Sequence, residues 1–235
     1  MGISKYFTVN IKPTIIASKQ TGVFTTGDVV FDWTSFTVPK GAKRIIGITV
    51  LMRGPDGVAQ KPGLELYFAS TDDNSLGTVN ATADGVGFFN DLLGMVEVGA
   101  GEYGSYIDTM SVADTASRRN VLLPKTPEAN KSGYDTFYIG CLAVTSNLPS
   151  WVSTVIVDGV QGTSQPRLAV KTTNPQKCFA VGDVIHDEDD RLMGTVKTMD
   201  SSTLMTMEDN LANASVDNKD LYNLSPMAVL LHFES

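Results

Sequence analysis

The chain has 235 residues, of which 42% are hydrophobic and 19% are charged, and its formal net charge is −8 at pH 7. This composition is typical of a globular protein and excludes a disordered or collagen-like chain. The net acidity argues against a nucleic-acid partner, because phosphate recognition requires clustered Lys and Arg. No apolar run approaches the roughly 20 residues of a membrane helix, so no membrane partner is expected.

The first part of the chain contains short runs in which β-branched or aromatic residues alternate with polar ones. These runs are residues 6–17, 29–38, 44–52 and 64–69. A period of two between turn-forming Gly, Pro and Asp residues predicts strands. Pro13 lies inside the first run and places that strand at a sheet edge or a bend.

Residues 70–133 have a different pattern, with many small and polar residues and few regular runs. Residues 88–98 fit a helical turn followed by a strand, and residues 106–113 fit a helix or a strand equally. A compact domain seldom carries so long a stretch without regular structure unless the stretch has a function. We therefore expect a long irregular excursion at 70–133 that reaches toward a neighbouring molecule.

The second half of the chain again shows the strand pattern. The expected strands are residues 134–144, 152–157, 168–172, 181–185, 192–199 and 203–207. Residues 211–224 have helical spacing and fit a short helix or an irregular crossover. Residues 227–233 are almost wholly apolar, which predicts a buried terminal strand. Many short strands separated by turns predict an all-β sandwich or barrel.

Three features of the sequence are candidates for chemical sites. Residues 99–104 (GAGEYG) match G-x-G-x-x-G, but Arg118 and Arg119 stand where the acid of a dinucleotide site belongs, which favours a plain glycine-rich loop. Residues 186–190 (HDEDD) fit a solvated hairpin tip or, as the alternative, a weak divalent-cation site. Cys141 and Cys178 lie in apolar runs and are expected to be free thiols.

No catalytic motif is present, neither G-x-S-x-G nor H-E-x-x-H nor a phosphate-binding loop. We therefore expect no enzymatic activity, no cofactor and no metal. Aromatic side chains are enriched at interfaces, although most aromatic residues belong to a core. The candidate interaction residues on this basis are Phe88, Phe89, Tyr103, Tyr106 and Trp151.

The last quarter of the chain resembles a segment common in structural proteins of tailed bacteriophages. The residues that carry the resemblance are Gly182-Asp183-Val184, Gly194-Thr195-Val196, residues 200–203, residues 210–214 and Pro226. Residues 1–165 are loosely similar to a jelly-roll β-sandwich of virion proteins. The resemblance implies a jelly-roll-like sandwich over residues 1–168. A small acidic barrel-like module follows over residues 169–235, with the strand 227–233 as a candidate to return to the main sheet.

The resemblance also implies a function. It points to a non-enzymatic virion protein, and among these to a capsid decoration (cement) protein that bridges capsid subunits on the head surface after synthesis in the host bacterial cytoplasm. The implied partners are the major capsid protein and further copies of the chain, and a trimer is one expected form. No clear N-terminal arm is present, so residues 1–20 or 70–133 are the candidate attachment segments. The alternative is a tail, neck or fibre-associated module that binds a host glycan.

Overall fold

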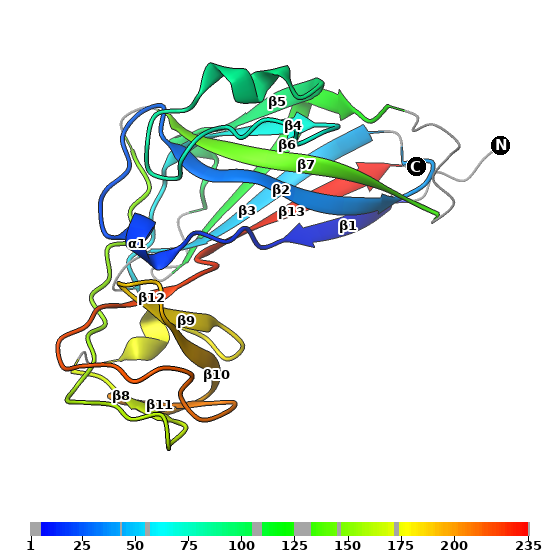
Figure 1. Cartoon of the computed structure of the whole chain (residues 1–235). Coiled ribbons are helices and arrows are strands. Elements are labelled where there is room, and N and C mark those ends of the chain that lie inside the picture. Colours follow the sequence, from blue (N-terminus) through cyan, green and yellow to red (C-terminus); the bar gives the residue numbers. More distant parts are fainter. Residues whose placement is uncertain are drawn as a thin grey trace.

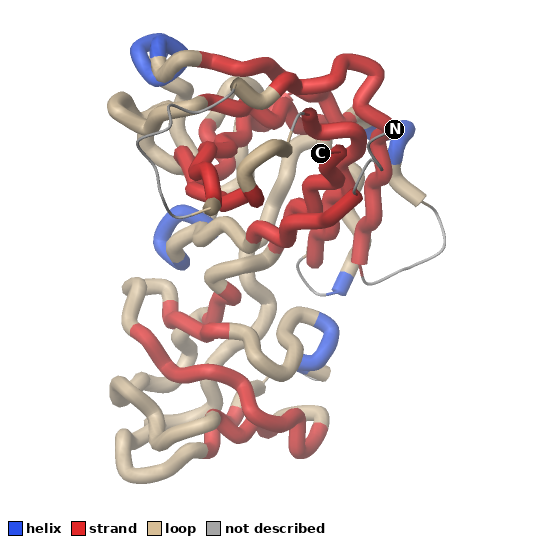
Figure 2. The backbone as a smooth tube through the Cα atoms, turned by 90° about the vertical axis from the view of Figure 1, so that its right-hand side faces the viewer, coloured by secondary structure: helices blue, strands red, loops and turns tan. Residues whose placement is uncertain are grey.

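The computed structural model describes residues 6–42, 44–54, 57–104, 110–124, 133–144, 147–171 and 174–234. The chain forms a large β-sandwich with a smaller β-module beside one end of it (Figure 1). Figure 2 shows the two parts stacked along one axis, with both ends of the chain at the sandwich. None of the described helices has the length and apolarity needed to cross a membrane.

The sandwich consists of two four-stranded antiparallel sheets. The first sheet has the order β1-β13-β3-β6, and the second has the order β2-β7-β4-β5. The bounds are β1 (Tyr6–Ile11), β2 (Val29–Pro39), β3 (Arg44–Arg53), β4 (Gly63–Ala69), β5 (Leu92–Val98), β6 (Met110–Leu122), β7 (Tyr134–Val144) and β13 (Met227–Glu234).

The order of these strands is that of a jelly roll. Counted within the sandwich alone, the sheets read 1-8-3-6 and 2-7-4-5, which is the double-sheet arrangement of two Greek keys. The all-β, jelly-roll-like fold is therefore confirmed. β13 lies between β1 and β3 in the first sheet, and every second residue of it is buried.

The core of the sandwich consists of aromatic and aliphatic side chains, because alternation places the apolar residues of each strand on its inner face. Phe233 of β13 stacks on Phe7 of β1 with ring centroids 5.0 Å apart, and its ring lies 6.1 Å from that of Phe36 in β2. Phe233 is fully buried. One side chain of the last strand therefore joins both sheets.

The expected irregular excursion at 70–133 is wrong over two segments, because β5 and β6 are regular strands of the sandwich. β6 carries the small buried residues Ser111, Ala113 and Thr115, so its local sequence lacks the apolar alternation of a strand. Pairing with β3 in the first sheet forms the strand instead. Tertiary pairing can override local propensity in this way.

Residues 70–91 pack back onto the outer face of the second sheet. Leu76 is fully buried and shares a small cluster with Val29 and Leu142 of the sheet. Beside it, Phe88 of the short helix η2 (Gly85–Phe89) meets Tyr67 edge-on, with ring centroids 4.9 Å apart. This segment therefore covers one sheet face of its own chain.

Replacement of Gly140 tests this cover. A methyl group at Gly140 would overlap the end of the Leu76 side chain and would lie 3.3 Å from the Trp33 ring. We expect Gly140→Ala to displace the 70–84 segment and to lower the free energy of unfolding by about 1–3 kcal/mol. Urea denaturation checks the energy. Limited proteolysis at 70–84 checks the displacement, and unchanged cleavage would contradict it.

The module is inserted between β7 and β13 of the sandwich. Its sheet has the order β12-β9-β10-β11-β8. The bounds are β8 (Arg167–Ala169), β9 (Val184–Asp187), β10 (Leu192–Ser201), β11 (Leu204–Met207) and β12 (Leu221–Asn223). The short helices among the described residues include α1 (Ala17–Gln20), η2 (Gly85–Phe89), η3 (Ala100–Glu102) and η4 (Pro175–Lys177).

The module is barrel-like, although its sheet does not close. Ile156 forms an isolated bridge to Asp220 beside β12, and Val157 forms one to Val170 beside β8. These bridges place residues 156–157 between the two end strands. The core of the module begins at Val155, upstream of the expected boundary at residue 169. Residues 211–224 contain β12 and turns rather than a helix.

Candidate functional site

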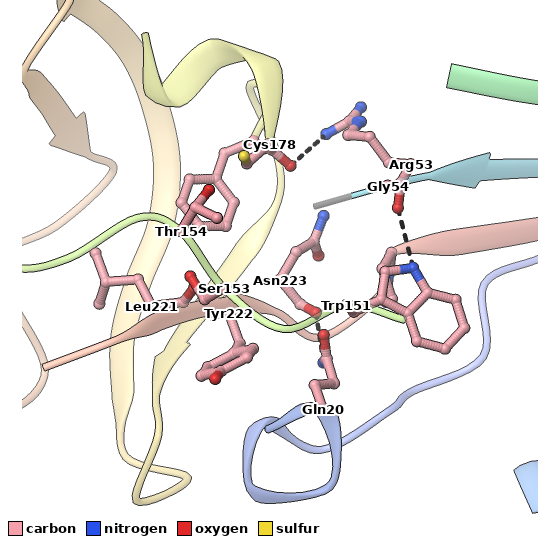
Figure 3. Close-up of a pocket in the computed structure, with 12 residues that line it drawn as sticks. Gln20, Arg53, Gly54, Trp151, Ser153, Thr154, Cys178, Leu221, Tyr222 and Asn223 are labelled. Atoms are coloured by element: carbon pink, nitrogen blue, oxygen red, sulfur yellow. Dashed lines mark hydrogen bonds between the residues drawn. The ribbon is translucent and has the colours of Figure 1, made fainter. Parts of the chain in front are cut away.

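The junction between sandwich and module is a dense polar contact (Figure 3). Arg53 at the end of β3 forms an ion pair with Asp183 of the module, with an N–O distance of 2.6 Å. The same carboxylate oxygen accepts hydrogen bonds from the backbone N–H of Ala180 at 2.7 Å and from Asn223 Nδ2 at 2.8 Å. One oxygen of Asp183 therefore joins three segments of the chain.

Two further side chains close the junction. Gln20 Nε2, on α1, donates to the backbone oxygens of Ile15 at 2.6 Å and of Asn223 at 2.8 Å. Trp151 Nε1 donates to the backbone oxygen of Arg53 at 2.9 Å. Gln20 and Trp151 are buried, so these bonds form away from water, where an unpaired polar group would be costly. Of these bonds, the one from Gln20 to Asn223 joins the sandwich side to the module, and the one from Trp151 fixes the end of β3 beside it.

A small pocket lies inside the junction, lined by Gln20, Trp151, Cys178 and Asn223 among others. Its volume is about 30 Å³. A cavity of this size has room for an ordered water, whereas small-molecule sites have volumes of roughly 300–1,000 Å³. The pocket is therefore suited to hydration of the junction rather than to a substrate.

The five candidate interaction residues do not form one surface. Trp151 is 4% exposed and meets Phe24 edge-on, and Tyr103 is 5% exposed within the sandwich core. Their expected surface role is wrong, and the core alternative applies to both. Phe88 is half-buried, and Tyr106 lies outside the described residues. Phe89 is 82% exposed, and Val86 and Leu92 close to it in sequence are exposed as well.

Three of the four carboxylates at the acidic hairpin tip form ion pairs. Asp187 is fully buried, and its Oδ2 pairs with Arg191 Nη2 at 2.7 Å. Lys219 pairs with Glu188 at 2.6 Å and with Asp189 at 3.1 Å. Within the part of the chain that the structure describes, no three His, Cys, Asp or Glu side chains are grouped as metal ligands.

The glycine-rich loop and the two cysteines, the remaining candidates, show no arrangement typical of a binding site among the described residues. The glycine-rich loop contains only the three-residue helix η3, and Glu102 accepts a hydrogen bond from the Gly99 N–H at 3.1 Å, so no helix opens as a dinucleotide site requires. Cys141 is a free thiol in the core, and burial raises its pKa well above the usual value. Cys178 is a half-buried free thiol.

Sequence reasoning missed a polar chain across the outer face of the first sheet. His232 Nδ1 lies 3.0 Å from Thr8 Oγ1, and its Nε2 lies 3.0 Å from Thr49 Oγ1. Thr49 in turn donates to Asp114 at 3.1 Å. Because the Thr49 hydroxyl donates to Asp114, the donor in the His232–Thr49 bond is His232 Nε2. These bonds tie all four strands of the sheet together.

Two exposed carboxylates in the module predict an acid-sensitive stability. Hydrogen bonds from Thr198 and Thr206 lower the pKa of Asp200, and the hydrogen bond from Lys171 lowers the pKa of Asp217. Their contribution to stability is complete above the ordinary Asp pKa of about 3.9 and is lost as the pH falls through the lower folded values. We expect Asp200→Asn with Asp217→Asn to flatten the decline of the urea midpoint between pH 5 and pH 2. An equally steep decline in both proteins would contradict this.

A second feature that the sequence did not reveal is an open groove between β1 and β2. The groove has a volume of about 310 Å³. Val9 and Ile11 of β1 and Phe36 of β2 form its apolar part, because these side chains belong to the sandwich core or pack against it. Its polar part consists of Asn10, Lys12, Thr34, Ser35 and Thr37. Both strands are sheet edges and lie along the same side of the sandwich (Figure 1).

Comparisons with known proteins give no family for this chain. No protein-family model matches it, and no curated protein matches it. Among solved structures, a serine protease of Aeromonas sobria is 10% identical over 99% of this chain, with a TM-score of 0.21. The chain spans 28% of that protein's length. A TM-score this low carries no argument about fold or activity.

Proposed function

We propose that the chain is a non-enzymatic virion protein of a tailed bacteriophage, a decoration protein that stabilises the head by bridging capsid subunits. The observation that carries this proposal is the open groove between β1 and β2, in contrast to the small pocket at the junction. The junction pocket has a volume of about 30 Å³, whereas the groove of about 310 Å³ lies along two exposed sheet edges. A long open edge is suited to contact with another protein.

The contacts between module and sandwich support the same proposal. A bridging protein transmits force between its neighbours only if its own parts keep a fixed arrangement. The Arg53–Asp183 ion pair and the hydrogen bond from Gln20 to Asn223 are the contacts that favour such an arrangement here. The acidic module adds a surface that attracts a basic partner over a distance of about one Debye length.

The test mixes the purified protein with expanded capsids that lack it. We expect the protein to saturate these capsids at a fixed stoichiometry and to raise their melting temperature, measured by calorimetry. In the control, the capsids are heated after the same protein has been denatured and removed from the sample. Failure to bind capsids would overturn the proposal. Failure combined with binding to a glycan array would support a tail, neck or fibre-associated module instead.

A further inference from the structure

We propose that the groove between β1 and β2 is a strand-acceptor site, in which an extended segment of a neighbouring capsid subunit pairs with the free edge of β1. This inference rests on the proposed function and names the surface and the partner segment for it. The added segment would lie beside β1, on the open side of the sandwich.

The edge of β1 is regular. β1 pairs with β13 over residues 6–11 without a register shift. The pairings of the other three sandwich edges, β2 with β7, β5 with β4, and β6 with β3, each contain a register shift. β1 has neither a proline nor a charged residue within its bounds. Bulges, prolines and charges are the usual protection of edge strands, and β1 has none of them.

The free edge of β1 offers hydrogen bonds. In an antiparallel pair, every second residue directs its N–H and C=O away from its partner strand. Among the described residues, no strand pairs with the side of β1 opposite β13. An added strand would satisfy these groups, as in other cases of strand addition.

The groove defines the side chains of the added strand. Successive side chains of a strand point to opposite faces, so every second residue of the segment would face the half-buried Val9, beside Ile11 and Phe36, which are only 4% and 5% exposed. These positions require apolar residues of moderate size. The intervening residues would face the polar rim or solvent. The segment is therefore an alternating apolar and polar sequence, with small apolar residues entering the groove.

Charge favours a capsid subunit over a second copy of the chain. Lys12 is the charged residue among those that line the groove. Residues 6–12 contain no carboxylate, so β1 of a second copy would supply no partner for Lys12. Two copies also carry −8 each and repel one another. The segment that fits carries an Asp or Glu at the end that meets Lys12.

Amide hydrogen exchange of the wild-type protein tests the site directly. The exchange is measured for the free protein and for the protein bound to expanded capsids that lack it. We expect exchange to slow by about tenfold or more on binding at those amides of residues 7–11 that point away from β13, because new strand hydrogen bonds protect them. Residues 34–37 across the groove are expected to slow less, because they lose solvent without pairing.

A matched pair of variants tests the same site by affinity. Val9→Lys places a charge at the groove, which blocks strand addition, and Leu92→Lys makes the same change of charge on the exposed edge strand β5. We expect Val9→Lys to weaken capsid binding by about tenfold or more and Leu92→Lys to leave it near wild type. Circular dichroism of each free variant establishes that it is folded. If Val9→Lys does not fold, the exchange measurement decides.

The outcomes separate this inference from the proposed function. Wild-type binding without slower exchange at residues 7–11 overturns the strand-acceptor site and leaves the decoration function standing. Absence of wild-type binding overturns both. A dimer of the free protein that Val9→Lys disrupts would assign the groove to a second copy, and it overturns the capsid segment as occupant.

Discussion

Phe233→Ala is expected to lower the free energy of unfolding by about 3–5 kcal/mol, which is the usual cost of removing a buried aromatic ring. Phe233 is fully buried, and its ring contacts Phe7 of β1 and Phe36 of β2. The substitution removes contacts within the first sheet and between the two sheets at once. Because small domains are stable by only about 5–15 kcal/mol, the loss is a large fraction of the total.

Urea denaturation followed by tryptophan fluorescence measures this loss. The control is Leu230→Ala on the same strand, where the side chain is half-buried. We expect the control to cost less than half as much, because a partly exposed side chain leaves a smaller cavity. Equal losses in the two variants would contradict the role of Phe233 as the contact between the sheets.

Asp183→Ala is expected to have the second-largest effect, a loss of about 2–4 kcal/mol. The side chain accepts hydrogen bonds from Arg53, Ala180 and Asn223 through one oxygen, and it is only 16% exposed. Its removal leaves three donors without their acceptor, one of them a half-buried guanidinium. Donors that lose a partner in such surroundings cost more than the hydrogen bond itself contributed.

The same variant is expected to loosen the module on the sandwich. Calorimetry of Asp183→Ala should show a broadened or divided transition, since the two cores are joined mainly through this junction. The control is Asp158→Ala, which removes the same charge from an exposed position in the module. A single sharp transition in Asp183→Ala, with a midpoint equal to that of the control, would show that the ion pair does not couple the two parts.

Asp183→Ala also tests the proposed function in the capsid-binding experiment. A decoration protein whose parts move independently binds its capsid at fewer points at a time. Asp183→Ala would then bind capsids with normal stoichiometry and give a smaller rise in their melting temperature than the wild type. The capsid measurement thereby separates rigidity from docking, which the groove variants address.

Strands with a clear alternation of apolar and polar residues could be predicted from the sequence alone. Alternation over residues 134–144, 192–199 and 203–207 placed β7, β10 and β11, because a half-buried strand requires a period of two. The same reasoning left the start of β6 open between helix and strand, because its inward residues Ser111, Ala113 and Thr115 are small. Such a strand forms because β3 pairs with it.

Which side chains contact one another depends on the tertiary structure. Asp183 and Arg53 are 130 positions apart, and no local pattern links them. Trp151 and Tyr103 belong to residue types that are enriched at interfaces, yet the fold buries both. The groove between β1 and β2 likewise depends on sheet order, because two edges become neighbours only when the sandwich closes. Periodicity indicates which face of a strand is buried. It does not indicate which distant strand it pairs with, and this long-range pairing positions the module, the junction and the free edge of β1.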